Sequence, residues 1–194
     1  MCIRDRLKLL YLHGFNSSPE STKAITFKKF LSNQDKKNLI VPNLPISPKD
    51  SINLLSEIIE KENKEISIIG SSLGGLYSSY LGNIYGLKNV LINPVVPEHL
   101  EFMKDIIGEH SNYQTKEKYK FTESNYQELL DLKFNDLNFP MNHFCLVQLG
   151  DEVLDQKLTI NFFRKSLVII EKNGIHQFEG FERYLNLIYD FMIN

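Results

Sequence analysis

Gly70, Ser72 and Gly74 form a Gly-x-Ser-x-Gly pattern between an apolar run and a stretch typical of a helix. A serine on a sharp strand-to-helix turn holds its hydroxyl clear of the backbone, beside the positive end of the helix dipole, and there it serves as a nucleophile. Glycines two residues away on either side let the strand and the helix pack closely around that strained turn. The alternative is a glycine-rich turn that only packs tightly or holds a phosphate, but the lysine of a phosphate-binding loop does not follow here.

A serine nucleophile needs a base, and a carboxylate that orients the base; in this arrangement they follow in the order serine, acid, histidine. Asp151 directly follows one apolar run, and His176 follows the next apolar run after a short loop. The carboxyl ends of parallel strands meet at one edge of a sheet. We therefore expect Ser72, Asp151 and His176 to converge as a catalytic triad.

Other residues compete for the roles of acid and base. Glu152 and Asp155 are rival acids, and Asp151 is favoured because it lies nearest the end of its strand. The other histidines are expected to be structural or solvated: His13 precedes the serine, His99 and His110 fall in an irregular segment, and His143 begins a strand at the wrong edge.

Acyl transfer also needs backbone N–H donors for the oxyanion of the tetrahedral intermediate. Leu73, the residue after the serine, is expected to supply one donor. The second is expected from Phe15, because Gly14 lets the loop after the first strand approach the site closely. Taken alone, His13-Gly14 is equally typical of an ordinary turn at the end of a strand.

Six short apolar runs alternate with amphipathic stretches, which predicts a parallel sheet with helices on both faces. The expected fold class is α/β, a three-layer α/β/α sandwich with a mostly parallel, doubly wound sheet. The strands are expected at 7–12, 39–41, 66–69, 90–92, 144–149 and 167–170. The helices are expected from Pro19, capped by Ser18, to about Leu31, from Pro48, and at 76–85, 156–164 and 181–193.

One charged segment, at about 98–138, breaks this alternation and shows only helical hints at 100–107 and 126–132. Its aromatic and aliphatic side chains suit a lid over an acyl-binding pocket. A solvated surface excursion with a few anchors is the equal alternative. Residues 7–194 are expected to form a single domain with this lid-like insert.

Composition excludes several classes of protein. The chain has 194 residues, 42% of them hydrophobic, which is enough for one core without disulfides or a metal. The 22 basic and 24 acidic residues give a formal net charge of −2, unlike the basic excess of nucleic-acid-binding proteins. No run of 18 apolar residues predicts a membrane span.

Cys2 and Cys145 lie far apart without metal-ligand spacing, which fits a reducing compartment, and Cys145 is expected to be buried in a strand. Residues 1–6 are too charged for a signal peptide and share no pattern with the rest of the chain, so they are expected to be a leader that is disordered or not native. The expected location is cytoplasmic.

With these pieces assembled, the sequence resembles the α/β-hydrolase superfamily, and more closely the small bacterial YqiA/YcfP-like esterases. The motifs that carry the resemblance run from the first strand to the carboxyl terminus: Tyr11 to Pro19, Gly70 to Gly75, Tyr85 to Lys88 leading into Leu91 to Pro94, Gly150 to Asp155, His176 to Phe178 and Gly180 to Glu182. One departure is the Asn173-Gly174-Ile175 run before the histidine, where the family tends to have small or acidic residues.

The resemblance implies Ser72, Asp151 and His176 as the triad and hydrolysis of carboxylic esters or acyl thioesters, with no cofactor and no metal. The expected partner is a small-molecule ester or thioester, and the oligomeric state is left open. A hydrolase fold that has lost catalysis and serves as a binding protein is the alternative of another class.

Overall fold

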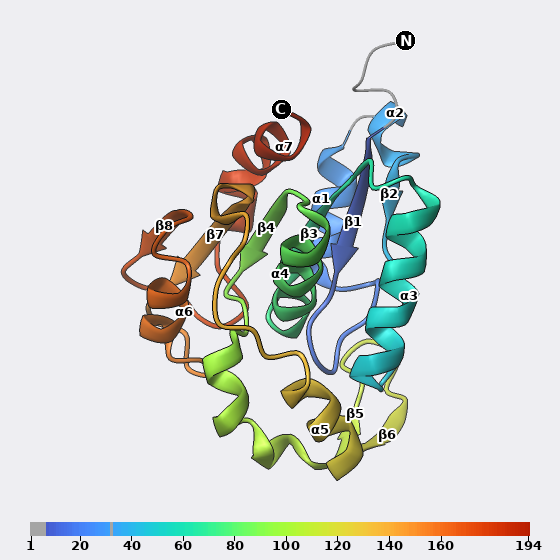
Figure 1. Cartoon of the computed structure of the whole chain (residues 1–194). Helices are drawn as coiled ribbons and strands as arrows, with labels where there is room; N and C mark the ends of the chain where they lie inside the picture. Colours follow the sequence, from blue (N-terminus) through green and yellow to red (C-terminus); the bar gives the residue numbers. More distant parts are fainter. Residues whose placement is uncertain (1–6, 32) are drawn as a thin grey trace.

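The computed structural model describes residues 7–31 and 33–194, so the expected leader at 1–6 lies outside the described residues. Its centre is a six-stranded sheet in the order β2-β1-β3-β4-β7-β8 in which every neighbouring pair is parallel (Figure 1). The strands are β1 (Lys8–Leu12), β2 (Leu39–Ile40), β3 (Ile66–Ser71), β4 (Asn89–Ile92), β7 (His143–Gln148) and β8 (Leu167–Glu171). The predicted parallel, doubly wound sheet is confirmed.

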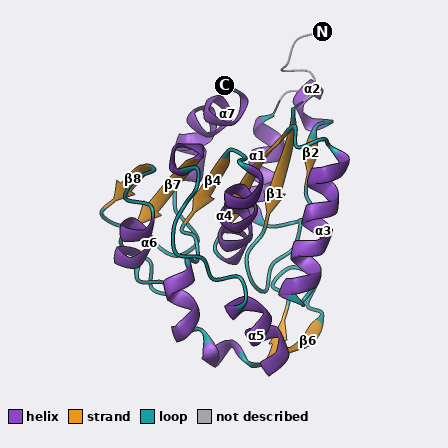
Figure 2. Cartoon of the chain, in the orientation of Figure 1, coloured by secondary structure: helices purple, strands orange, loops and turns teal. Residues whose placement is uncertain are grey.

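Helices cover both faces of this sheet (Figure 2). They are α1 (Thr22–Phe30), the short α2 (Asn33–Lys36), α3 (Pro48–Lys61), α4 (Leu73–Tyr85), α6 (Gln156–Phe162) and α7 (Leu185–Ile193). Side chains alternate along each strand, so Leu10 and Leu12 of β1 pack towards α3 and α4, whereas Leu9 and Tyr11 pack towards α1 and α7. Cys145 is fully buried in β7, as predicted.

The segment at 98–138 has helices close to both of the stretches where the sequence hinted at them, and one further element. It holds two 3₁₀ helices, Pro97–Phe102 and Lys104–Ile106, and then an antiparallel hairpin of β5 (Gly108–Ser111) and β6 (Lys118–Phe121) that the sequence did not suggest. Helix α5 (Glu123–Leu130) follows and is capped by Thr122, whose hydroxyl accepts a hydrogen bond from Asn125 N at 3.2 Å. Figure 1 shows the hairpin and α5 below the carboxyl ends of the central strands.

Several helix boundaries also differ from expectation: α4 begins at Leu73 and not at Leu76, and α6 ends at Phe162 and not at Arg164. Helix α1 begins at Thr22, not at Pro19, because Ser18 closes a turn: its hydroxyl accepts from Glu20 N and its carbonyl from Ser21 N. The closing helix predicted from Phe181 begins instead with a 3₁₀ turn, Phe181–Tyr184, before α7. Helix ends are the part of an element that local pattern defines least.

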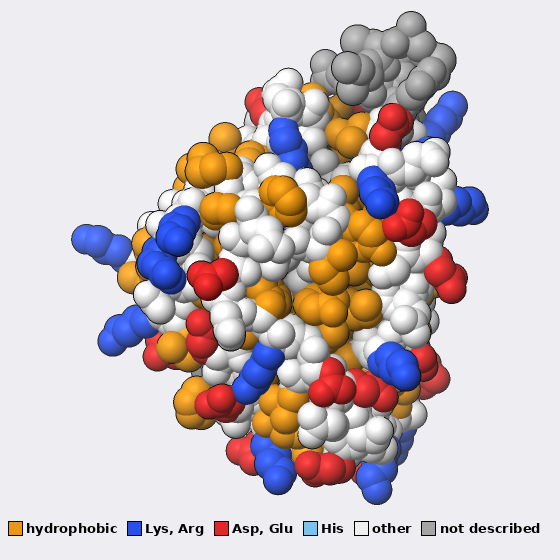
Figure 3. Space-filling model, viewed as in Figure 1, with side chains coloured by type: hydrophobic (Ala, Val, Ile, Leu, Met, Phe, Trp, Pro, Cys, Tyr) orange, Lys and Arg blue, Asp and Glu red, His pale blue; other side chains and the backbone are white. Residues whose placement is uncertain are grey.

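The face in Figure 3 carries hydrophobic side chains gathered between α3 and α4, with basic and acidic side chains interspersed around them. This mixture matches the nearly balanced charge of the chain. None of the described helices is long and apolar enough to cross a membrane.

Candidate active site

Ser72 occupies the sharp turn between β3 and α4, with φ 55° and ψ −121°. The turn is crowded: a Cβ on Gly70 would collide with the carbonyl oxygen of Gly74, and a Cβ on Gly74 would collide with the carbonyl oxygen of Leu12. Its backbone is tied to the next strand, because Ser72 N donates to Ile92 O at 3.1 Å. The packing therefore holds the serine in a sparsely populated backbone conformation.

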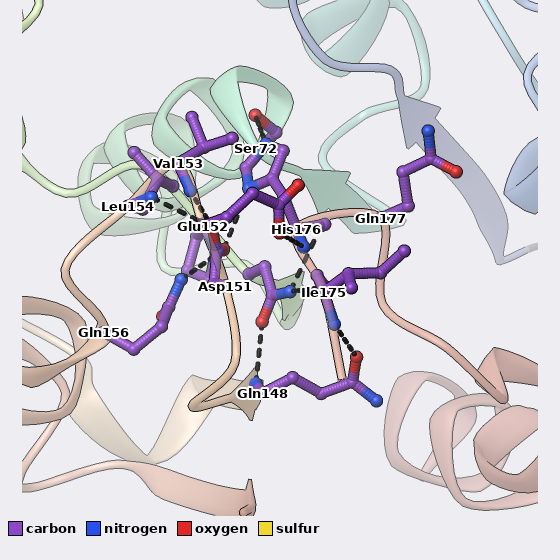
Figure 4. A network of polar contacts seen from close by, with 12 residues as sticks. Ser72, Gln148, Asp151, Glu152, Val153, Leu154, Gln156, Ile175, His176 and Gln177 are labelled. Atoms are coloured by element: carbon purple, nitrogen blue, oxygen red, sulfur yellow. Dashed lines mark hydrogen bonds and ion pairs between the residues drawn. The ribbon is translucent and has the colours of Figure 1, made fainter. Parts of the chain in front are cut away.

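Ser72, His176 and Asp151 form a continuous chain of hydrogen bonds at the carboxyl ends of three strands (Figure 4). Ser72 Oγ lies 2.9 Å from His176 Nε2, and His176 Nδ1 lies 2.8 Å from Asp151 Oδ2. With Nδ1 protonated and donating to the carboxylate, Nε2 is free to accept the proton of the serine hydroxyl. The structure thus brings together the three residues that the sequence singled out.

The Asp151 carboxylate is held on both oxygens. Oδ1 accepts from Val153 N and Leu154 N, each at 2.9 Å, and Oδ2 accepts from Gln156 Nε2 at 2.6 Å. Burial of the carboxyl raises its pKa, but the hydrogen bonds and charge of His176, with the two backbone donors, outweigh burial and lower the pKa below its usual value. Asp151 is therefore an anion whose position is fixed.

The rival acids lie nearby but serve other groups. Asp155 caps α6, where its side chain accepts from Lys157 N at 3.0 Å. Glu152 accepts from the backbone N–H of His176 at 2.9 Å and does not bond to the imidazole ring.

The other four histidines form no hydrogen bond with Ser72 or Asp151 among the described residues. His13, His99, His110 and His143 each have a ring nitrogen within 3.0 Å of a backbone carbonyl oxygen. Burial lowers the pKa of His13, His99 and His143, which keeps these rings neutral at neutral pH. No group of three or more His, Cys, Asp or Glu side chains in the described ranges is placed to hold a metal ion.

The loop after β1 lies against the serine turn. A Cβ on Gly14 would lie 3.0 Å from Ser72 Cβ, so only glycine permits this approach without displacing a neighbour. The N–H groups of Phe15 and Leu73 find no acceptor among the described residues. Both predicted donors are therefore unpaired within the described part of the chain.

The hairpin of the insert fixes the far side of this loop. Tyr113 N donates to Asn16 O, and Asn112 Nδ2 donates to Ser17 O, both at 2.7 Å. The Phe15 ring packs edge-on against His110, at 4.8 Å between centroids, and against Phe121, at 5.4 Å. The insert is thus bonded to the segment that carries Phe15.

Two side chains that sequence reasoning missed support the loop that carries His176. Asn93, after β4, donates from Nδ2 to Ile175 O at 3.0 Å and to His176 O at 3.1 Å. Gln148, at the end of β7, accepts from Ile175 N at 3.2 Å and from Glu179 N at 2.8 Å. Their position directly after or at the end of a strand is the only signal in the sequence, and it does not say which loop they contact.

A six-stranded parallel sheet with a serine on the sharp turn after β3 defines an α/β-hydrolase fold, and solved structures share it. The chain is similar to Est1E from Butyrivibrio proteoclasticus with ferulic acid bound, with a TM-score of 0.76 at 13% identity over 98% of this chain and 89% of that one. It is also similar to a monoacylglycerol lipase from Paleococcus ferrophilus, with a TM-score of 0.72 at 13% identity over 97% and 95% of the two chains. The likeness defines the fold.

The chain belongs to the family described as "Uncharacterised protein family (UPF0227)", whose profile matches residues 8–193. A UPF0227 protein of Shewanella woodyi is 34% identical over 140 residues, covering 68% of this chain and 76% of that protein. Another, from Serratia proteamaculans, is 26% identical over 191 residues, covering 93% and 96%. The resemblance drawn from the motifs is confirmed for the α/β-hydrolase fold and for the family.

Proposed function

We propose that the protein is a serine hydrolase that cleaves carboxylic esters through an acyl-enzyme intermediate. The observation that carries this proposal is the hydrogen-bonded chain from Ser72 Oγ through the His176 ring to the Asp151 carboxylate. A serine hydroxyl becomes a strong nucleophile when an oriented imidazole takes its proton.

In the first half of the reaction, His176 Nε2 takes the proton as Ser72 Oγ attacks the acyl carbonyl carbon. The N–H groups of Phe15 and Leu73 donate to the oxyanion that forms, and Asp151 stabilises the imidazolium. His176 then gives its proton to the departing alcohol oxygen. Water, activated by the same base, hydrolyses the acyl-enzyme and regenerates Ser72.

A cavity of about 240 Å³ beside the two oxyanion donors is suited to the acyl group. Phe15 and Leu73 supply both the N–H donors and part of its wall, so a carbonyl held by these donors directs its acyl chain along that wall. The insert contributes Tyr119 and Phe121 to the same wall. In this proposal the segment 98–138 shapes the acyl site as a fixed part of it.

The test uses p-nitrophenyl esters and acyl-thioesters of increasing chain length, together with labelling by a fluorophosphonate probe. Ser72→Ala is expected to abolish ester turnover and labelling, whereas Ser124→Ala, an exposed serine on α5, is expected to keep both. Labelling of Ser72→Ala at the wild-type level would overturn the proposal. Faster turnover of thioesters than of esters at every chain length would assign the same residues to thioester hydrolysis, and an unlabelled wild type would indicate a binding protein.

A further inference from the structure

A second, larger cleft of about 410 Å³ extends from Ser72 and His176 along the amino end of α1. One wall is the segment 175–182, which includes the histidine, and the other is α1 with the turn before it. The wall from α1 is rich in polar side chains: Ser21, Thr22, Lys23 and Thr26. The cleft shares Phe15 with the smaller cavity, but only the larger cleft is lined by Lys23 and by the segment 175–182.

Lys23 is the one Lys or Arg among the residues that line this cleft. Its ammonium donates to the carbonyl oxygen of Gln177, the residue directly after His176, at 2.7 Å. No carboxylate oxygen of the described residues lies within 4.0 Å of it. Two of the three donors of this ammonium thus have no described partner beside the reacting groups.

Lys23 is half-buried, and its hydrogen bond to Gln177 lies at the surface. Partial burial lowers the pKa of its amine to about 8, and no neighbouring carboxylate offsets that effect. The amine still carries its proton in most molecules at neutral pH. Glu179 and Glu182 also line the cleft, but both are exposed to solvent and neither forms an ion pair with Lys23. An anion entering the cleft would supply the missing partner.

The position of Lys23 indicates which part of an ester it faces. The imidazole of His176 must reach the departing alcohol oxygen to protonate it, so the alcohol part lies on the histidine side of Ser72. The larger cleft contains His176 and the residues after it, whereas these residues do not line the smaller cavity.

We propose that the larger cleft binds the alcohol part of the ester and that Lys23 pairs with an anionic group, a carboxylate or a phosphate, on that part. This inference rests on the proposed hydrolase function and assigns a substrate class to the same site. Lys23 is then a residue that determines specificity, and the hydrogen bond to Gln177 fixes its ammonium next to the loop of the general base.

The experiment compares two matched pairs of butyryl esters that differ in charge. The carboxylate pair is the ester of meta-hydroxybenzoate and that of meta-hydroxybenzamide; the phosphate pair is butyrylglycerol phosphate and butyrylglycerol. The measured quantity is kcat/KM of the anionic ester divided by kcat/KM of its neutral partner. Lys23→Met is expected to lower this ratio roughly tenfold for at least one pair, which is the size typical of a lost hydrogen bond to a charged group.

The responding pair identifies the anion as a carboxylate, a phosphate or either. Lys23→Arg, which keeps the charge, is expected to retain most of the preference, and Lys28→Met, an exposed lysine on the same helix, to leave the ratio unchanged. An unchanged ratio in Lys23→Met overturns the inference while the hydrolase function stands. If kcat/KM also falls equally for the charged and neutral esters, Lys23 only supports Gln177. If the wild type hydrolyses none of these esters and Ser72 is not labelled, the proposed function fails and this inference fails with it.

Discussion

The Tyr119 hydroxyl donates a hydrogen bond to Asn16 Oδ1 at 2.5 Å, joining strand β6 of the insert to the residue directly after Phe15. Asn16 has a φ of 56°, a left-handed conformation that needs support in any residue but glycine. Burial raises the pKa of Tyr119 to about 12, so this hydroxyl remains a donor throughout the neutral range. Tyr119 thus holds the loop whose Phe15 N–H is the proposed oxyanion donor.

Replacing Tyr119 with phenylalanine is expected to lower kcat about fivefold with little change in KM, because a hydrogen bond of about 1 kcal/mol no longer fixes the loop that carries Phe15. Steady-state kinetics on a p-nitrophenyl ester measures this split. Tyr85→Phe, at the end of α4, removes a hydroxyl away from the loop and serves as the control. A rise in KM with an unchanged kcat would instead assign Tyr119 to substrate binding alone.

Asp151→Asn is expected to reduce kcat by a factor on the order of 10³–10⁴. The amide can turn its N–H donors towards Nδ1, and it carries no negative charge to stabilise the imidazolium. Asp155→Asn is the matched control, since asparagine caps a helix as well as aspartate does. Comparing kcat for the two variants, with circular dichroism to check folding, tests whether Asp151 is the acid of the triad. A larger loss of kcat in Asp155→Asn would assign that role to Asp155.

Gly70→Ala is expected to destabilise the protein by about 3 kcal/mol, because the new methyl group would collide with the carbonyl of Gly74. Urea unfolding measures the change in the free energy of unfolding. Gly108→Ala is the comparison: its φ is 150° but no atom lies within 4 Å of the added Cβ, so only backbone strain of about 1 kcal/mol is expected. Equal losses in the two variants would contradict the steric account of the serine turn.

The pH dependence of stability is expected to report on Lys23. Its pKa is lowered from 10.5 to about 8 in the folded state, so between these values the unfolded chain binds more protons and stability rises with pH. Unfolding free energies of wild type and Lys23→Met are measured across this range, and the difference between the two curves cancels the titration of the tyrosines. The free energy of unfolding of the wild type should rise relative to that of Lys23→Met as pH rises. A difference that does not change with pH would mean that Lys23 is solvated.

The catalytic candidates could be predicted because Ser72 and Asp151 closely follow apolar strands and His176 follows another after a short loop. Short runs such as those before Gly70 and Asp151 define buried parallel strands, and the topology of such a sheet brings their carboxyl ends together. The glycines around Ser72 identify the turn, since no other residue fits there.

The hairpin β5–β6 could not be predicted in the same way. Its strands, Gly108–Ser111 and Lys118–Phe121, are short and mostly polar, without the alternation that indicates a strand. Contacts with Phe15, almost a hundred residues earlier in the chain, hold it in place, and local sequence does not encode them. The same reason hid Lys23, whose partner at Gln177 is distant in sequence.

The hydrogen bonds from the hairpin to Asn16 and Ser17 have a consequence for how this scaffold can change. A surface excursion that only covered the site could be exchanged between relatives to alter substrate choice while the speed of the chemistry was preserved. Here Asn112, Tyr113 and Tyr119 bond to the same short loop that presents the Phe15 N–H. Under the proposed function, turnover and selectivity therefore change together, and a foreign insert grafted here would have to replace these three contacts to keep the rate of the reaction.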